Sequence, residues 1–236
     1  AAILVAHSHY DHALDAPAVA WRTGAMLVGS ESTLNIGRGY GLSDDQMQLV
    51  DVSEPLKFGR FTVEMILSEH SPHGKFKGLI ESPLRAPARA KEYKMAECYS
   101  MLITHASAAG RTRRVLVHAS AGFKPGCLEG RRADVVFLGI APVGKQSDQF
   151  RDDYWRETVQ TIKARRVFPI HWDDFTLPLS EPLQAMPYVA DDFTVTMDFL
   201  EKRRVTEGVE IVMPKPFERI DPFTGLGSTA SAPVTL

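Results

Sequence analysis

One short segment near the start of the chain concentrates side chains that bind divalent metal ions. It reads HSHYDH and places three imidazoles and one carboxylate within six positions. Side chains two residues apart in an extended segment point to the same side, so His7 and His9 can bind one cation from a single strand end. Asp11 and His12 follow where the chain turns and can face a second cation. The spacing predicts a metal site, with chance clustering of surface histidines as the alternative.

Further histidines stand where predicted strands end, which is where loops on a rigid sheet carry function. His70 follows a predicted hairpin, and His171 directly follows a late apolar strand. Each is a candidate ligand, with a solvated loop histidine as the alternative. His118 ends another strand and is either a ligand or a core residue held by hydrogen bonds. Asp11 is expected to bind the metal or to orient the attacking water.

Residues close to these ligands can move protons or orient the ligand rings. His73 lies three residues after His70, and Asp173 and Asp174 lie just after His171. We expect His73 and Asp173 to act as general acids or to hold the ligand imidazoles in place. The sequence does not separate these roles.

The pattern of apolar and polar residues predicts the elements that position the donors. Each candidate ligand lies where an apolar run ends. No internal repeat and no long linker interrupts the pattern, so we expect a single α/β domain over residues 1–236 with a polar tail at 225–236. Strands are predicted at 2–6, 25–28, 56–58, 61–68, 99–105, 114–118, 133–140, 167–170 and 209–212, and helices at 13–22, 30–36, 148–165 and 192–203.

Composition argues against several classes of function. The chain has 236 residues, a formal net charge of −2 and a pI near 6.5, which argues against nucleic-acid binding through phosphate attraction. Cys98 and Cys127 are the only cysteines, so neither a disulfide framework nor a cysteine-based zinc site is available. No apolar run is long enough to predict a membrane span.

The start of the sequence suggests a truncated chain. The first predicted strand begins at residue 2 without a cap, a turn or a starting Met. No cationic, apolar signal segment opens the sequence, which favours a soluble cytoplasmic protein. The truncation leaves open a targeting signal before residue 1.

The motif HSHYDH after a strand, a histidine after a hairpin and a histidine after a late strand together resemble the metallo-β-lactamase superfamily of metal-dependent hydrolases. The resemblance runs from residue 1 to about residue 174. Within the superfamily, the segment PIHWDDF is most similar to the branch of ascorbate-phosphate lactonases and N-acyl-phosphatidylethanolamine phospholipase D. The resemblance implies a four-layer αββα fold, without the leading strands that precede the motif in this family. A second copy of the chain could cover that sheet edge.

The resemblance also implies which residues bind metal. Two groups of three residues follow from it, and Zn²⁺ suits their imidazole and carboxylate donors best, with Mn²⁺ or Fe²⁺ also suitable. Ser120 stands where the family has a bridging Asp, so three alternatives stay open: His118 reaches the metal, one metal binds, or two metals share only water or hydroxide. The first group is His7, His9 and His70, and the second is Asp11, His12 and His171.

The implied activity is hydrolysis of a small ester or lactone by water or hydroxide activated at the metal. Phosphodiester hydrolysis, of the phospholipase D type or of a cyclic phosphate, is the alternative reaction. A degenerate member that binds a metal or ligand without turnover is the alternative of another class. The expected partner is a small ester, lactone or phosphoester, and no nucleic acid.

A cationic stretch runs from residue 75 to residue 94, shortly after His70. It holds six lysines and arginines against two glutamates. It forms either an anion-attracting rim beside the metal or a solvated loop face. The cations are Lys75, Lys77, Arg85, Arg89, Lys91 and Lys94.

Overall fold

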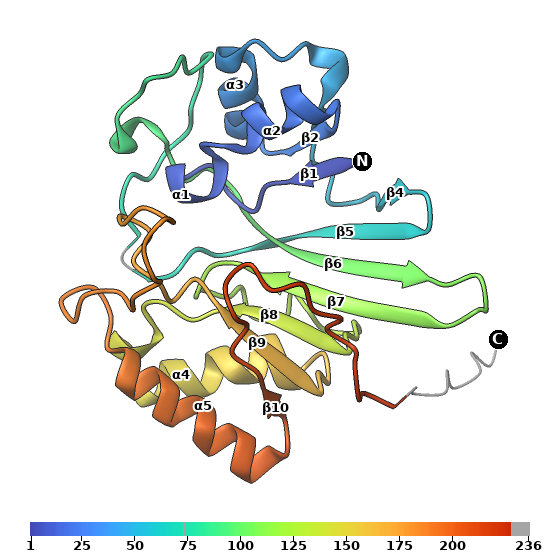
Figure 1. Cartoon of the computed structure of the whole chain (residues 1–236), viewed down its shortest axis with the longest axis vertical. Coiled ribbons are helices and arrows are strands. Elements are labelled where there is room, and N and C mark those ends of the chain that lie inside the picture. Colours follow the sequence, from blue (N-terminus) through green and yellow to red (C-terminus); the bar gives the residue numbers. More distant parts are fainter. Residues whose placement is uncertain (73, 228–236) are drawn as a thin grey trace.

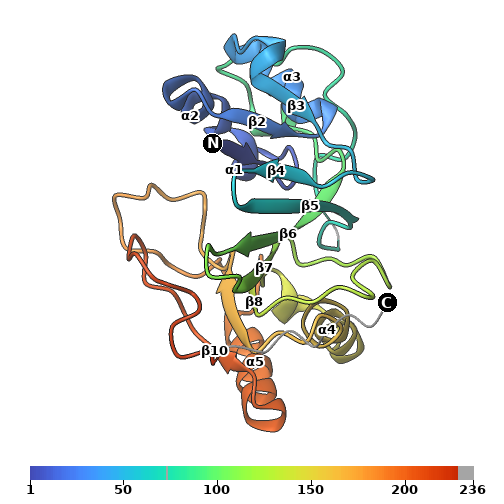
Figure 2. The same ribbon diagram turned by 90° about the vertical axis from the view of Figure 1, so that its right-hand side faces the viewer.

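Two β-sheets lie between two layers of helices in the computed structural model, which describes residues 1–72 and 74–227. Helices cover the outer face of each sheet, at the top and at the bottom of the molecule in Figure 1 and again in the perpendicular view of Figure 2. The expected four-layer αββα arrangement is therefore confirmed. His73, a candidate general acid, falls outside the described residues.

The smaller sheet carries the first metal-binding motif. Its strands are parallel and lie in the order β1-β2-β3. The motif begins three residues after β1 ends, as the sequence predicts for a strand that delivers ligands. The elements of this half are β1 (Ala2–Leu4), α1 (Tyr10–Ala13), α2 (Ala16–Thr23), β2 (Met26–Gly29), α3 (Glu31–Tyr40), the 3-10 turn η1 (Asp44–Gln46) and β3 (Met47–Leu49).

The larger sheet has seven strands in the order β10-β9-β8-β7-β6-β5-β4. The strands from β4 to β7 pair antiparallel, and those from β7 to β10 pair parallel. The parallel crossovers place helices on the outer face of this sheet. Its elements are β4 (Leu56–Phe58), β5 (Phe61–Ser68), η2 (Ala90–Glu92), β6 (Cys98–Ala106), β7 (Thr112–His118), β8 (Val135–Gly139), η3 (Val143–Lys145), α4 (Asp148–Trp155), a π-helical turn (Arg156–Gln160), β9 (Arg166–Ile170), α5 (Phe193–Glu207) and β10 (Glu210–Ile211).

Three apolar clusters hold the layers together. One lies between the small sheet and its helices, around Leu27 and Leu34. The second lies between the two sheets and includes Met65. The largest packs the outer face of the large sheet against α4 and α5, with Trp155 fully buried at its centre. The sheets are therefore fixed to each other by burial, which gives the loops at their edge a rigid base.

The predicted helices have different limits in the structure: the one predicted at 13–22 begins at Ala16, after the separate short helix α1, and the one predicted at 192–203 continues to Glu207. The helix predicted at 30–36 begins after its Ser30 cap as expected but continues to Tyr40, and Gly41 ends it with a positive φ of 102°. The segment predicted as one helix over 148–165 changes to a π-helical turn after Trp155. In the described part of the chain, no helix has the length and apolar character needed to cross a bilayer.

Candidate metal centre

Six side chains from three loops meet at one edge of the sheets. The loops that follow β1, β5 and β9 come together on the left of Figure 1. In each of two groups of three, one ligand atom per residue lies within 4.8 Å of the other two. The groups touch where the rings of His7 and His12 are 3.9 Å apart between centroids. The first group, called triad 1, is His7, His9 and His70, and the second, triad 2, is Asp11, His12 and His171.

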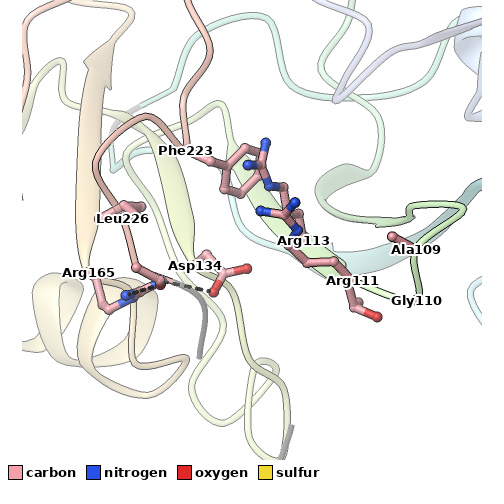
Figure 3. A pocket seen from close by; sticks show the side chains of 10 residues that line it. Ala109, Gly110, Arg111, Arg113, Asp134, Arg165, Phe223 and Leu226 are labelled. Atoms are coloured by element: carbon pink, nitrogen blue, oxygen red, sulfur yellow. Dashed lines mark hydrogen bonds and ion pairs between the residues drawn. The ribbon is translucent and has the colours of Figure 1, made fainter. Parts of the chain in front are cut away.

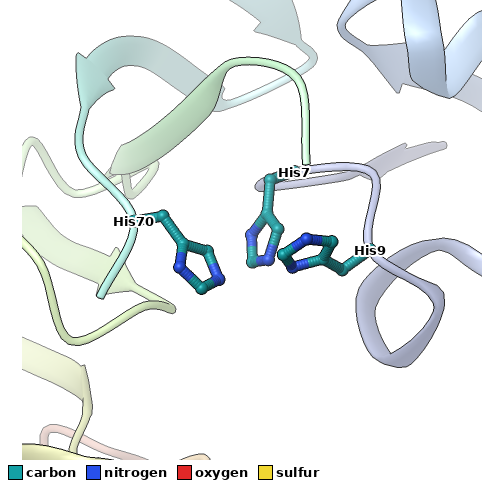
Figure 4. A group of neighbouring side chains, drawn as sticks. All are labelled: His7, His9 and His70. Atoms are coloured by element: carbon teal, nitrogen blue, oxygen red, sulfur yellow. The ribbon is translucent and has the colours of Figure 1, made fainter. Parts of the chain in front are cut away.

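In triad 1, backbone carbonyls fix which nitrogen carries the proton. His9 Nε2 lies 2.9 Å from the carbonyl oxygen of Lys75, and His70 Nδ1 lies 3.1 Å from that of Ser71. A carbonyl only accepts, so these contacts place a proton on His9 Nε2 and favour one on His70 Nδ1, where the Ser71 hydroxyl also lies at 3.1 Å. The lone pairs of His9 Nδ1 and His70 Nε2 are left available for an ion, and the three rings converge in Figure 4. Hydrogen bonds of this kind orient histidine ligands in metal sites.

His7 is the most buried member of triad 1. Its side chain is 1% exposed, and Nε2 is buried without a hydrogen-bond partner among the described residues. Its other nitrogen, Nδ1, lies 4.0 Å from the sulfur of Cys98. An unsatisfied buried polar atom is costly, and an ion at this position would satisfy it.

Triad 2 is built around one carboxylate oxygen. Asp11 Oδ2 lies 3.2 Å from His12 Nε2 and 3.1 Å from His171 Nε2, and the two nitrogens are 3.1 Å apart. His171 adopts a positive φ of 56° directly after β9. A non-glycine residue rarely adopts this conformation, and here it turns the ring toward the other two donors.

The charge states suit metal binding. Burial lowers the pKa of His7 and of His9, and it lowers the pKa of His70 to about 4. Burial disfavours ionised Asp11, but hydrogen bonds from His12 and His171 outweigh it and hold the carboxyl pKa below its usual value. Triad 1 therefore offers neutral imidazoles at pH 7, and triad 2 includes an ionised carboxylate.

This donor set fits a divalent ion of the zinc type. In triad 1 the buried His7 Nε2 has no hydrogen-bond partner among the described residues, and the rings of His9 and His70 lie beside it, which is unfavourable unless a cation lies among them. Imidazole and carboxylate are ligands that Zn²⁺, Mn²⁺ and Fe²⁺ accept. We therefore propose triads 1 and 2 as the metal ligands.

His118 is not part of either triad. Its Nδ1 accepts a hydrogen bond from the Ser100 hydroxyl at 2.7 Å, and its Nε2 donates to the Gly122 carbonyl at 2.6 Å. Both nitrogens of this buried ring are therefore occupied, which favours the alternative of a core residue held by hydrogen bonds over that of a metal ligand. Ser120 Oγ lies 3.0 Å from the backbone nitrogen of Ser71 and accepts its hydrogen bond. This hydrogen bond positions Ser71, whose carbonyl oxygen is the partner of His70 Nδ1.

The remaining predicted residues lie nearby. Asp173 lines a shallow depression with Asp11 and His171 on one side of triad 2, and its charge helps Asp11 to raise the pKa of His171 against the effect of burial. Asp174 accepts hydrogen bonds from Thr176 in a local turn. The sequence did not reveal the Lys75 carbonyl as a partner of His9, because a backbone acceptor has no residue-type signature.

A cavity of about 810 Å³ opens on the triads. Both contribute to its lining, with His9 and His70 from triad 1 and Asp11 and His171 from triad 2. Ser120 also lines it. A small organic molecule placed there would lie beside the metal ligands.

A second cavity, of about 360 Å³, lies at the other end of β7 (Figure 3). Three arginines line it, but Arg165 pairs with Asp134 at 3.5 Å, and Arg113 lies 3.4 Å from the carboxylate of Asp221. It contains neither metal triad, so we do not place the reaction there.

Solved structures show the same architecture. No protein-family model matches the chain, and no curated protein matches it significantly. The metallo hydrolase Igni18 from Ignicoccus hospitalis superposes with a TM-score of 0.58 at 16% identity, over 91% of this chain and 76% of that one. YhfI from Bacillus subtilis, a metallo-β-lactamase fold protein, gives 0.53 at 14% identity over 91% and 74%. CmlA, a diiron β-hydroxylase from Streptomyces venezuelae, gives 0.53 at 17% identity over 89% and 43%.

Proposed function

We propose that this chain, which has the metallo-β-lactamase fold, is a metal-dependent hydrolase that acts on a small ester or lactone. The observation that carries the proposal is the convergence of two metal-ligand triads beside one cavity. The similarity to the metallo hydrolase Igni18 supports hydrolysis. The diiron hydroxylase CmlA has the same fold, so the fold alone does not choose the reaction.

The residues around the triads prepare the site for this chemistry. A divalent ion held by triads 1 and 2 would lower the pKa of bound water to about 7 and would polarise a carbonyl group. Lys75 and Ser71 hold the protons of His9 and His70 away from the centre through their carbonyl oxygens. Asp11 is ionised and lines the cavity, where it can bind the ion or orient the attacking water.

Neither Cys98 nor Ser120 offers a covalent route at this centre. Burial raises the pKa of the Cys98 thiol to about 12, so the thiolate is absent at neutral pH. The Ser120 hydroxyl accepts the Ser71 hydrogen bond and has no neighbouring general base among its hydrogen-bond partners in the described residues. Water is therefore the nucleophile that we propose. Asp173, beside triad 2, and His73 are the groups that we propose either to orient the ligand imidazoles or to transfer a proton to the leaving group.

The test uses two chromogenic substrates, p-nitrophenyl acetate and bis-p-nitrophenyl phosphate, each with chelator and after Zn²⁺ is restored. We expect cleavage of the ester that chelator abolishes and Zn²⁺ restores. The variant His9→Ala should lose this activity, whereas His105→Ala should keep it because that ring packs on Phe61 in the hairpin, outside the cavity. Cleavage of the phosphate alone would favour a phosphodiesterase. If the zinc-loaded protein cleaves neither substrate, the result would favour the third alternative, a degenerate protein that binds a metal or ligand without turnover.

A further inference from the structure

The ammonium groups of two lysines in the wall of the cavity have no role in the proposed reaction. Lys75 lies in the loop after β5 and Lys145 ends η3, and both line the cavity beside the triads. Two carboxylates also line it, Asp11 in triad 2 and Asp191. Asp191 is 2% exposed, its Oδ1 accepts hydrogen bonds from Gly144 and Asp192, and burial raises its pKa. The exposed charges that line the cavity are therefore the positive charges of Lys75 and Lys145.

Lys145 is held in a fixed place at the cavity. Its Nζ lies 3.3 Å from the centre of the Tyr188 ring, a cation–π contact. The backbone of η3 is anchored as well, because Gly144 donates to Asp191 at 3.1 Å. A Cβ on Gly144 would lie 2.0 Å from the Asp192 carbonyl oxygen, which shows how closely η3 packs on the start of α5. A charge on a fixed support loses little entropy when it binds a partner.

Lys75 is tied to the metal centre itself. Its carbonyl oxygen accepts the hydrogen bond from His9 Nε2, so the backbone that carries this ammonium group is placed by a metal ligand. A group bound by Lys75 would therefore lie within reach of this side chain from the metal centre. Lys75 and Lys145 come from different loops, so the two cations approach the cavity from separate segments.

The rest of the wall is mainly apolar. Phe76 follows Lys75, and Phe175, Met186 and Val189 come from the segment between β9 and α5. Val189 is 89% exposed, which is unusual for a branched apolar side chain next to a cavity. Such a surface gains free energy when an apolar group covers it.

We propose that the substrate is an anionic amphiphile. Its anionic group binds Lys145 and Lys75, and its apolar part packs against Phe76, Phe175 and Val189, with the ester bond at the metal centre. The position of the ester rests on the proposed function, whereas recognition of the amphiphilic anion rests on the cavity alone.

The first experiment compares two esters that differ only in charge. Mono-4-nitrophenyl glutarate and 4-nitrophenyl valerate share a leaving group and a five-carbon acyl chain, and only the glutarate carries a free carboxylate. We expect zinc-loaded protein to have the higher kcat/KM for the glutarate. Lys145→Met and Lys75→Met should each lower that preference about fivefold, the upper range for an exposed ion pair. Lys202→Met, an exposed lysine on α5, is the control for net charge. Equal kcat/KM for both esters would overturn the proposal.

The second experiment measures binding without hydrolysis. The probes are 8-anilinonaphthalene-1-sulfonate and its neutral analogue N-phenyl-1-naphthylamine, followed by fluorescence. We expect tighter binding of the sulfonate, and a rise in its Kd of about tenfold or more in the double variant Lys75→Met, Lys145→Met. If neither ester is cleaved but the sulfonate still binds more tightly than its neutral analogue, the proposal of ester hydrolysis is refuted and the proposal that the cavity binds an anionic amphiphile is supported. If esters are cleaved but neither experiment shows a preference for the anion, the proposal of an anionic substrate is refuted while the proposal of ester hydrolysis is supported.

Discussion

Replacing His118 tests whether this histidine is a structural core residue or a metal ligand. His118→Ala removes two buried hydrogen bonds, of 2.7 Å to Ser100 and 2.6 Å to Gly122, and leaves both partners unsatisfied in the core. Each bond is worth about 1 kcal/mol and the lost ring volume adds to the cost, so we expect a loss of about 2–4 kcal/mol in the free energy of unfolding. The zinc content at saturation should not change. Urea denaturation and elemental analysis measure the two quantities.

The same residue gives a pH dependence with a definite sign. Burial lowers the pKa of His118 to about 4. The unfolded chain, with a His pKa of about 6.5, binds the extra proton first, so stability present above pH 6.5 is lost as the pH falls toward 4. This loss, about 3 kcal/mol from His118, should be missing from the variant when both proteins are measured with chelator. If His118→Ala does not fold, His118→Gln, which keeps a donor for Gly122, replaces it. A variant of unchanged stability that binds one ion fewer would refute this reasoning.

Three further predictions concern the centre and its support. Zinc at 100 times its Kd should raise the melting temperature by about 5–10 °C, because ligand binding stabilises the folded state, and calorimetry of His9→Ala, which lacks a ligand of triad 1, should show a smaller shift. Ser120→Ala removes the acceptor of the Ser71 N–H and should weaken zinc binding about tenfold in competition with a chromophoric chelator; unchanged affinity would contradict the positioning role of Ser120. Gly122→Ala places a Cβ 2.1 Å from the His70 carbonyl oxygen and should lower the free energy of unfolding by about 2–3 kcal/mol, visible as a lower urea midpoint. If Gly122→Ala has the same urea midpoint as the wild-type protein, the backbone near His70 moves to accept the added Cβ without a loss of stability.

The sequence predicts most of the large sheet and the strand ends that bear ligands. The hairpin at 56–58 and 61–68 has the predicted limits, because alternating apolar residues flank Gly59, which adopts a positive φ of 61°. His70 and His171 follow β5 and β9 as expected. These features depend on local patterns, which is why they can be predicted from sequence.

Features that depend on distant contacts could not be predicted. The helix α3 continues past its glycines because they allow close packing: a Cβ on Gly39 would lie 1.9 Å from the Leu84 carbonyl oxygen. The short strand β3 pairs with β2 and has little pattern of its own. The occupied nitrogens of His118 depend on Ser100, which lies on the neighbouring strand β6. A sequence shows that a histidine ends a strand but not which atoms surround its ring.

The most direct test of the central claim is anomalous X-ray scattering at the zinc edge from crystals of the zinc-loaded protein. The account predicts an anomalous peak in contact with His7, His9 and His70, and a second ion, where bound, in contact with Asp11, His12 and His171. A protein that binds no zinc, or a zinc peak away from both triads, would contradict it.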